Sequence, residues 1–319
     1  MTSESKPETN SGGTPIGFST QLPRLQTKIS STTLGQFKRC PRLYYYTVIL
    51  GRTSRDQNIH LVFGTLVHRS VAHYELERVR GKDHEEALRS TLRFAAGITW
   101  NKALQRPWVS NSTSKNRDGL LRTLVWYLDH YSKITGLSTI VLATGSPGIE
   151  IQFEFDSGFV SPVTGESVVF VGTLDRLVRF LDRLYIIDIK TTGRGVGTFH
   201  AKTFTPGNQF SLYSLAGNVT LEEPVAGIFL DAIDIGTTYS TFQRTEIPRS
   251  EDTLNEWLRD SHMVLEQMSQ CAERDYWPMN DTACYNCDFR DICSSEPKVR
   301  DMLLERQTVK KSEVDFANL

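Results

Sequence analysis

The sequence predicts one globular domain of the α/β class. Apolar residues recur at helical spacing over residues 63–80, 84–96 and 118–133, whereas residues 149–155 alternate apolar and polar side chains as a half-buried strand does. The 319-residue chain is 39% hydrophobic, with 36 Lys and Arg against 37 Asp and Glu, which is enough apolar material for a core and excludes disorder throughout.

The first helix and the mixed half of the chain follow from local patterns. Ser30, Ser31 and Thr32 are candidate N-caps for a helix that includes Leu34, and Pro41 interrupts or restarts that helix. The patterns further predict strands at 149–155, 167–180, 184–191, 225–234 and 238–246, helices at 209–216 and 250–274, and a Gly- and Thr-rich loop at 191–207. We expect residues 1–28 to be a flexible tail, residues 29–296 to form the domain with a helical insertion, and residues 297–319 to be a charged tail.

Cysteine usage and hydropathy predict a cytoplasmic protein, nucleoid-associated or in a phage-infected cell. The longest apolar runs are a few residues, and MTSESKPETN lacks the pattern of a signal peptide, so we expect no membrane segment. Five cysteines, an odd number, argue against a disulfide scaffold and for a reducing compartment. The net charge of −1 argues against a protein that coats nucleic acid by bulk charge.

The segments GTLDR and IIDIKTT suggest a metal and catalytic site. Asp188 and Lys190 are two residues apart on an apolar strand and so share one face, and Asp175 lies on the neighbouring strand. Two converging carboxylates suit Mg²⁺ or Mn²⁺, and a lysine beside them is suited to orienting a water for attack on phosphorus. A surface Asp–Lys pair on a hairpin edge is the alternative.

Three further side chains are weaker candidates by themselves. His68 lies at the border of an apolar helix, where a structural histidine is the commoner case. Gln209 and Tyr213 are four residues apart on a short helix and so lie on one face, either as ordinary surface or as a polar face beside the metal site.

The cysteines form a compact pattern near the end of the chain. Cys284, Cys287 and Cys293 are spaced C-x2-C-x5-C, which is typical of thiolates that bind one metal centre, and Cys40 or Cys271 would supply the fourth ligand. The chemistry leaves zinc and an iron–sulfur cluster both open.

Six segments in order resemble the RecB-type branch of the PD-(D/E)XK nuclease superfamily. Its iron–sulfur members, such as the AddB nuclease domain and CRISPR-associated and phage-borne exonucleases, are the nearest likeness. The segments are ISSTTLGQFKRCPRLYYY, FGTLVH, GTLDR, IIDIKTT, QFSLY and CYNCDFRDIC. The resemblance implies a restriction-endonuclease-like core, in which helices flank a central mixed sheet, and an iron–sulfur cluster that staples the N- and C-terminal regions together. Residues 97–117 match no motif of the family.

The resemblance also implies roles for single residues. The metal ligands would be His68, Asp175, Asp188 and the carbonyl of Ile189. Lys190 would be the catalytic lysine, and Gln209 and Tyr213 would assist at the DNA phosphate. A [4Fe–4S] cluster would be held by Cys40, Cys284, Cys287 and Cys293. Glu150 matches an acidic position in parts of the family, although an exposed strand glutamate explains it equally well. Cys271 would be the spare thiol.

The implied activity is a Mg²⁺- or Mn²⁺-dependent DNA exonuclease acting on single strands or duplex ends with 5′→3′ polarity. Its setting would be recombination, repair, replication or CRISPR-type processing, with a separate helicase, recombinase or integration protein as partner. A non-catalytic, metal-stapled DNA-binding accessory module is the main alternative, and a restriction-type endonuclease is another. The oligomeric state is not readable.

The distribution of charge along the chain favours nucleic-acid binding, although the net charge does not. Residues 30–55, 87–117 and 189–221 contain no Asp or Glu, and basic side chains there alternate with aromatic ones, as in grooves for single strands. The predicted DNA-binding residues are Lys38, Arg39, Arg42, Tyr45, Arg194 and Lys202.

Overall fold

Strand β8 (Arg183–Thr192) is the central strand of the sheet that carries the candidate site. It is buried from Leu184 to Ile189, as its near-continuous apolar sequence requires. It pairs antiparallel with β7 (Ser167–Phe180) and parallel with β9 (Val225–Ile235), and β9 pairs antiparallel with β10 (Ser240–Ile247). The sheet is therefore mixed and flanked by helices, which confirms the predicted α/β class.

The structure is a computed structural model that describes residues 17–55, 58–197, 201–221 and 223–310. The chain divides into two compact units, and β6 (Ile149–Val160) and β7 contribute residues to both. Unit 1 contains 17–55, 153–172 and 251–310, and unit 2 contains the described parts of 58–152 and 173–250. No boundary is predicted inside residues 29–296, because each unit is built from separated segments of the chain and no linker in the sequence marks the division.

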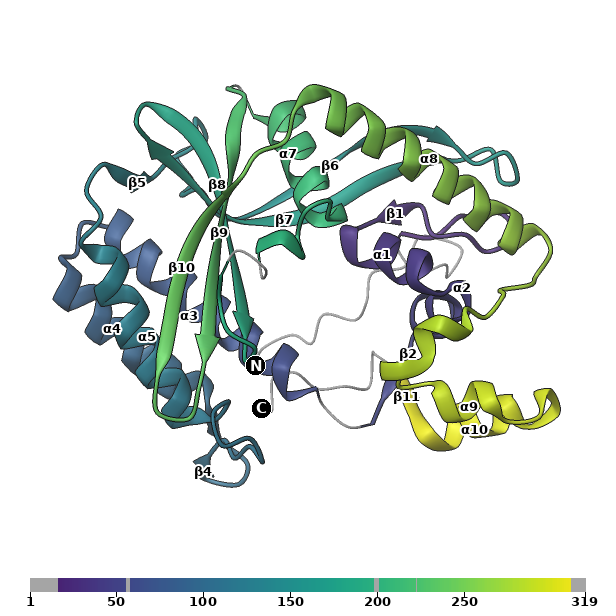
Figure 1. Ribbon diagram of the computed structural model, residues 1–319, viewed down its shortest axis with the longest axis horizontal. Coiled ribbons are helices and arrows are strands. Elements are labelled where there is room, and N and C mark those ends of the chain that lie inside the picture. Colours follow the sequence, from purple (N-terminus) through teal and green to yellow (C-terminus); the bar gives the residue numbers. More distant parts are fainter. Residues whose placement is uncertain (1–16, 56–57, 198–200, 222, 311–319) are drawn as a thin grey trace, which may run out of the picture. The chain divides into compact units, whose positions relative to one another are not determined.

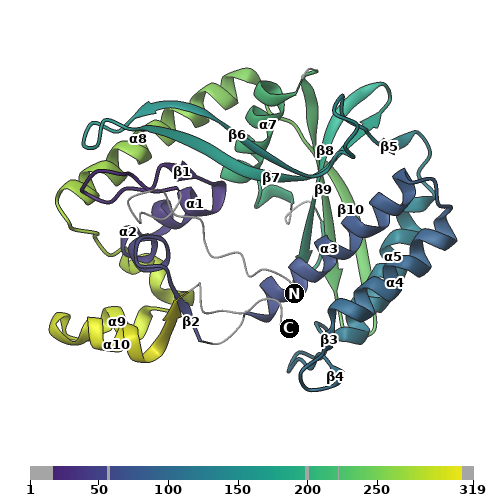
Figure 2. The same cartoon turned by 180° about the vertical axis from the view of Figure 1, so that it is seen from behind.

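In unit 2, helices cover both faces of the sheet, as Figures 1 and 2 show. Helices α3 (Ile59–Val79), α4 (His84–Ile98) and α5 (Arg117–Ser132) lie on one face, and α7 (Asn208–Thr220) lies on the other. The side chains of Asn58, Asp83 and Asn116 cap α3, α4 and α5 by accepting hydrogen bonds from backbone N–H groups in the first turn. Short strands β3 (Trp100–Asn101), β4 (Arg106–Pro107) and β5 (Leu137–Thr139) complete the unit.

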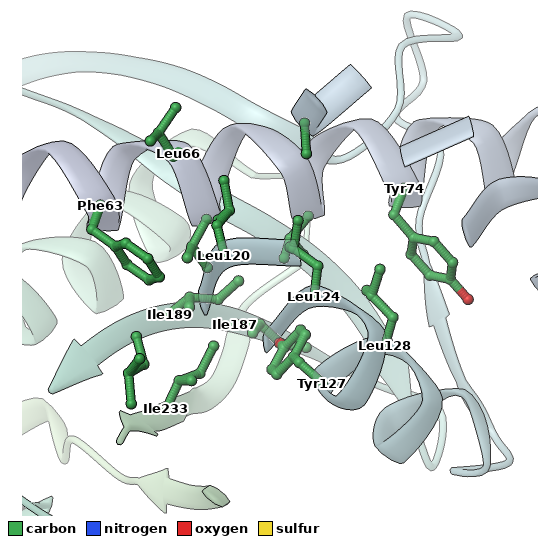
Figure 3. Packing of buried hydrophobic residues seen from close by; sticks show 14 of the residues in the cluster. Phe63, Leu66, Tyr74, Leu120, Leu124, Tyr127, Leu128, Ile187, Ile189 and Ile233 are labelled. Carbon is green, nitrogen blue, oxygen red and sulfur yellow. The ribbon is translucent and has the colours of Figure 1, made fainter. Parts of the chain in front are cut away.

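The core of unit 2 lies between the sheet and α3 and α5 (Figure 3). Residues Ile187 and Ile189 point from β8 into this core, so alternation directs Asp188 and Lys190 to the opposite face of the strand. The core side chains labelled there are Phe63, Leu66, Tyr74, Leu120, Leu124, Tyr127, Leu128, Ile187, Ile189 and Ile233.

One buried ion pair crosses this core. Asp231 on β9 is fully buried and accepts hydrogen bonds from Nε and Nη2 of Arg244 on β10, each at 2.6 Å. The hydroxyl of Tyr127 on α5 donates a third bond to the same carboxylate at 2.7 Å. The buried charge is therefore fully satisfied by hydrogen bonds from two different elements.

In unit 1, helix α8 (Glu251–Glu273) packs along the outer parts of β6 and β7. The rings of Trp257 and Phe170 are 5.5 Å apart, and His262 Nε2 lies 2.7 Å from the carbonyl of Ser157. Strand β1 (Lys28–Ile29) adds to β7 in parallel.

The rest of unit 1 consists of short elements. They are α1 (Ser31–Arg39), α2 (Pro41–Tyr44), a π-helical turn (Tyr45–Ile49), β2 (Arg52–Ser54), two 3₁₀ turns (Asp281–Asn286 and Pro297–Val299), α9 (Arg290–Ser294), α10 (Arg300–Gln307) and β11 (Thr308–Lys310). Ser30 is the N-cap of α1, and α1 ends before Pro41, as predicted.

The described ends of the chain carry regular structure where tails were expected. Leu25 is buried, and Phe18 forms a β-bridge with Gln26. Near the other end, α10 leads into β11, which pairs antiparallel with β2. Among the described residues, no helix combines the length and apolar character needed to cross a membrane.

Candidate active site

The site forms where strands β7 and β8 part. Their backbone pairing runs from Phe180 opposite Arg183 to Arg176 opposite Ile187. Beyond that point, the N–H of Ile189 donates to Oδ2 of Asp175 at 3.0 Å. The Asp175 carboxylate thus satisfies a backbone donor at the point where the strands separate and side chains from other elements enter.

His68 on α3 links the predicted ligands on β7 and β8. Its Nδ1 lies 3.1 Å from Oδ2 of Asp175, and its Nε2 lies 2.9 Å from the carbonyl oxygen of Ile189. Burial by itself lowers the pKa of His68, but the hydrogen bond and charge of Asp175 outweigh it, so the pKa lies above its usual value. The same contact holds the pKa of the Asp175 carboxyl below its usual value against the opposing effect of burial.

Asp188 is fully buried beside Lys190. Gln209 Nε2 donates to its Oδ1 at 3.2 Å, and Lys190 Nζ lies 2.6 Å from its Oδ2. Burial raises the pKa of Asp188 to about 6, although Lys190 opposes that rise. The short Lys190 contact pairs Oδ2 with a positive charge, and within the described part of the chain no other group donates to that oxygen.

Helix α7 brings Gln209 and Tyr213 to the same place. Gln209 Nε2 donates to the hydroxyl of Tyr213 at 2.9 Å as well as to Asp188, which confirms that the two side chains share one face of the helix. Burial and the nearby carboxylates raise the pKa of Tyr213 well above its usual value, so the phenol remains protonated at neutral pH.

Glu150 also joins the cluster. One ligand atom from each of His68, Glu150 and Asp175 lies within 4.8 Å of the other two. The backbone of Glu150 has a φ of +50°, in the left-handed region that non-glycine residues seldom adopt, and such strained positions concentrate at functional sites. Burial and the charge of Asp175 raise the pKa of Glu150. No pattern in the sequence predicts this backbone conformation.

The donor set fits a divalent cation. It offers one imidazole, the carboxylates of Glu150 and Asp175, and a backbone carbonyl, and the Asp188 carboxylate lies near enough for the charges of Asp175 and His68 to affect it. Oxygen-rich sets of this kind are preferred by Mg²⁺ and Mn²⁺. A cavity of about 950 Å³ borders the cluster, with His68, Glu150, Ile189 and Lys190 in its lining. The site therefore has room for an extended substrate.

The cysteines lie in unit 1. Cys40, Cys284, Cys287 and Cys293 all line one small cavity, and Cys271 on α8 does not. Among the described residues, their sulfur atoms do not form a group of three or more like that of His68, Glu150 and Asp175, in which the ligand atoms lie within 4.8 Å of one another.

The predicted DNA-binding residues are scattered. Arg39 donates to the carbonyls of Ala283 at 3.2 Å and Asn286 at 2.7 Å. Arg42 donates to the carbonyl of Trp277 at 3.1 Å, and the ring of that tryptophan stacks on Tyr45 at 5.7 Å. These three residues therefore hold the cysteine-bearing segment in place.

The other three predicted DNA-binding residues, Lys38, Arg194 and Lys202, are exposed. Arg194 and Lys202 belong to unit 2, and Lys38 belongs to unit 1. Contact with DNA stays a prediction for all six residues.

Two features beside the site escaped the sequence analysis. Arg176 Nη1 lies 2.7 Å from Oε1 of Glu75 and thereby ties β7 to α3 next to the candidate ligand Asp175. Lys115, from the insertion that matches no motif, is buried and donates to Nδ1 of His60 at 2.8 Å. Neither pair has a local spacing that marks it, because the partners are far apart in the chain.

The sheet is mixed, and two aspartates and a lysine lie where its strands β7 and β8 separate. A histidine from the helix that covers the sheet completes the site. This combination of fold and site is typical of nucleases. The sequence matches the profile of the PD-(D/E)XK nuclease superfamily over residues 28–294, and the chain belongs to this superfamily. No curated protein matches it significantly.

Two solved structures resemble the chain. The crystal structure of a candidate exonuclease from Eubacterium rectale matches with a TM-score of 0.50 and 11% identity, covering 86% of this chain and 92% of that one. At this identity the likeness shows the fold alone. The protein SSO0001 matches at 15% identity over 84% of this chain and 87% of its own, and its TM-score of 0.32 carries no argument.

Proposed function

We propose that the chain is a metal-dependent DNA exonuclease of the RecB-type, iron–sulfur branch of its superfamily. The observation that carries the proposal is the convergence of His68, Asp175, Asp188 and Lys190 at one point bordering a large cavity. These are the residues to which the sequence resemblance gives the catalytic roles. We further propose 5′→3′ polarity, and a place in DNA recombination, repair, replication or CRISPR-type processing, from that resemblance.

His68, Asp175, Asp188 and the carbonyl of Ile189 would hold Mg²⁺ or Mn²⁺, with Glu150 as a further carboxylate. When bound, the cation supplies positive charge that stabilises the oxyanions of phosphoryl transfer. Hydrolysis forms one P–O bond from water and breaks the P–O bond to the leaving strand, whose oxygen takes a proton.

Lys190 is the group suited to orienting the water. Its ammonium is fixed beside Asp188 at 2.6 Å and also lines the cavity, so its other N–H donors are available to a water or a phosphate oxygen. Gln209 holds the other oxygen of Asp188 and so keeps the carboxylate in one orientation.

The test uses protein purified without oxygen, end-labelled single- and double-stranded DNA, and Mn²⁺ or Mg²⁺. Asp188→Ala and Lys190→Met should each lower the cleavage rate about a hundredfold or more while DNA binding persists, because an active-site charge is removed without changing the surface. Lys133→Met, at the exposed C-terminal end of α5, is the matched control and should cleave normally. Undiminished cleavage by Lys190→Met protein would overturn the assignment.

The same assay separates the alternative of a non-catalytic DNA-binding module. That module would bind DNA and leave every labelled end intact with either cation. A helicase, recombinase or integration protein on a separate chain remains our proposal for the partner, and co-purification from the native cell would test it.

We also propose that Cys40, Cys284, Cys287 and Cys293 bind a [4Fe–4S] cluster. The support is that all four thiols line one cavity while the fifth does not. A single tetrahedral Zn²⁺ with bonds of about 2.3 Å needs sulfur atoms roughly 4 Å apart, and among the described residues no three of these thiols form a compact group. A larger cluster tolerates a wider spacing, and we expect it to be structural.

A further inference from the structure

A second cavity of about 620 Å³ adjoins the catalytic cavity in unit 2. The two cavities share His60 and Thr191 in their linings and are therefore direct neighbours. The second is lined by His60, Lys115, Thr203 and the described Gly-rich stretch from Thr191 to Gly197. Its volume lies in the range of about 300–1,000 Å³ that is common for ligand pockets.

Lys115 is the unexplained residue of this cavity. Only 3% of it is exposed, and its Nζ donates to Nδ1 of His60 at 2.8 Å. Within the described part of the chain, no carboxylate forms an ion pair with it. A buried ammonium has three donors and normally has an anionic partner, because desolvating an unpaired charge is costly.

The neighbouring charges meet that need only in part. The charge of Asp234 favours the Lys115 ammonium, but Asp234 forms no ion pair with it, and its Oδ1 accepts the N–H of Gly195 at 3.1 Å. Burial and the charges of Lys115 and Arg194 lower the pKa of His60, so this imidazole is neutral at pH 7 and brings no negative charge. Arg194 adds a second cation to the lining.

We propose that this cavity binds the terminal phosphate monoester of a DNA strand, with Lys115 and Arg194 as its anchors. A phosphate monoester carries about −1.5 to −2 charges at pH 7, more than the single charge of an internal phosphodiester, and so matches two cations better. A strand end held here would extend past Thr191 toward Lys190 in the catalytic cavity. The inference rests on the proposed nuclease function and adds the substrate feature that would make cleavage start from an end.

The test compares three labelled single-stranded oligonucleotides of one sequence: with a 5′-phosphate, with a 3′-phosphate, and with hydroxyls at both ends. Binding is measured by fluorescence anisotropy in EDTA, so that the result does not depend on cleavage. The wild-type protein should prefer one of the two phosphorylated strands over the hydroxyl-ended strand by at least about tenfold, as hydrogen bonds to charged groups contribute. The preferred arm identifies which end the cavity receives.

Lys115→Gln should reduce that ratio to near one. Lys133→Gln, at the opposite end of α5, should keep the wild-type ratio. Arg194→Gln, on the exposed loop, should also reduce the ratio, and it keeps the test decisive if the buried Lys115 substitution prevents folding.

Equal affinity of the wild-type protein for all three strands would overturn the proposal, as would an unchanged ratio in a folded Lys115→Gln or Arg194→Gln protein. A terminal-phosphate preference in EDTA without cleavage in Mn²⁺ would leave the cavity assignment standing and refute the nuclease proposal instead.

Discussion

The proposed iron–sulfur staple predicts a large loss of stability when one ligand is removed. A cluster that ties Cys40 to Cys284 closes a loop of 244 residues. By analogy with disulfides, closing a loop of this length removes unfolded-state entropy equivalent to about 5 kcal/mol. Cys287→Ala should therefore lower the free energy of unfolding of unit 1 by up to about 5 kcal/mol.

Direct contacts in the same region would compensate for only part of that loss. Arg39 donates to two carbonyls of the cysteine segment, and each such exposed bond contributes about 1 kcal/mol at most. The aromatic contact of Tyr45 with Trp277 adds a similar amount. The variant should still fold, but its unfolding midpoint should fall by about 10 °C or more.

The assay records the visible absorbance, the bound iron and zinc, and thermal unfolding of the anaerobically purified protein. Cys271→Ala is the matched control, since this thiol does not line the cavity and should leave colour and midpoint unchanged. A Cys287→Ala protein that loses its colour yet unfolds at the wild-type temperature would refute the staple. Stoichiometric zinc without iron in the wild-type protein would refute the cluster.

Two further predictions concern charges away from the site. Asp231→Ala leaves Arg244 buried without its partner and should lower the free energy of unfolding by about 3–5 kcal/mol in a urea titration. Glu223→Ala breaks an equally bidentate but half-exposed pair with Arg179 and should shift the unfolding midpoint little. Equal shifts for the two variants would contradict the reasoning. Hydrogen bonds from Lys82 and Ser90 hold the pKa of Glu77 at about 2, so this carboxylate contributes stability fully above its unfolded value near 4.5 and loses it as the pH falls toward 2. Glu77→Gln should accordingly be less stable than wild type at pH 7 and approach it below pH 4, and a difference that is the same at pH 7 and pH 3.5 would refute the sign.

Local sequence patterns predicted the elements well, because their causes are local. The strand expected at 167–180 is β7 with the same ends, and the helix expected at 250–274 is α8 at Glu251–Glu273. The ends of α1 followed from the cap at Ser30 and from Pro41. Alternation and helical periodicity are written into neighbouring residues, so tertiary context was not needed to read them.

The site required more than local patterns. Spacing alone placed Asp188 with Lys190, and Gln209 with Tyr213, but only the family resemblance joined these pairs to His68. The left-handed backbone of Glu150 and the burial of Lys115 had no marker in the sequence. Both depend on elements distant in the chain, which a one-dimensional pattern does not contain.

Ile189 shows how the core and the site constrain each other. Its side chain is buried among the apolar residues between the sheet and α3, while its N–H donates to Asp175 and its carbonyl faces Nε2 of His68. The hydrophobic packing of this one residue therefore fixes two polar backbone groups inside the candidate metal site. Because a strand alternates its faces, the same packing also sets the direction of Asp188 and Lys190 on either side of it. The apolar run IIDIK thus sets the face to which Asp188 and Lys190 point, and Gln209 from α7 then holds the Asp188 carboxylate in one orientation on that face.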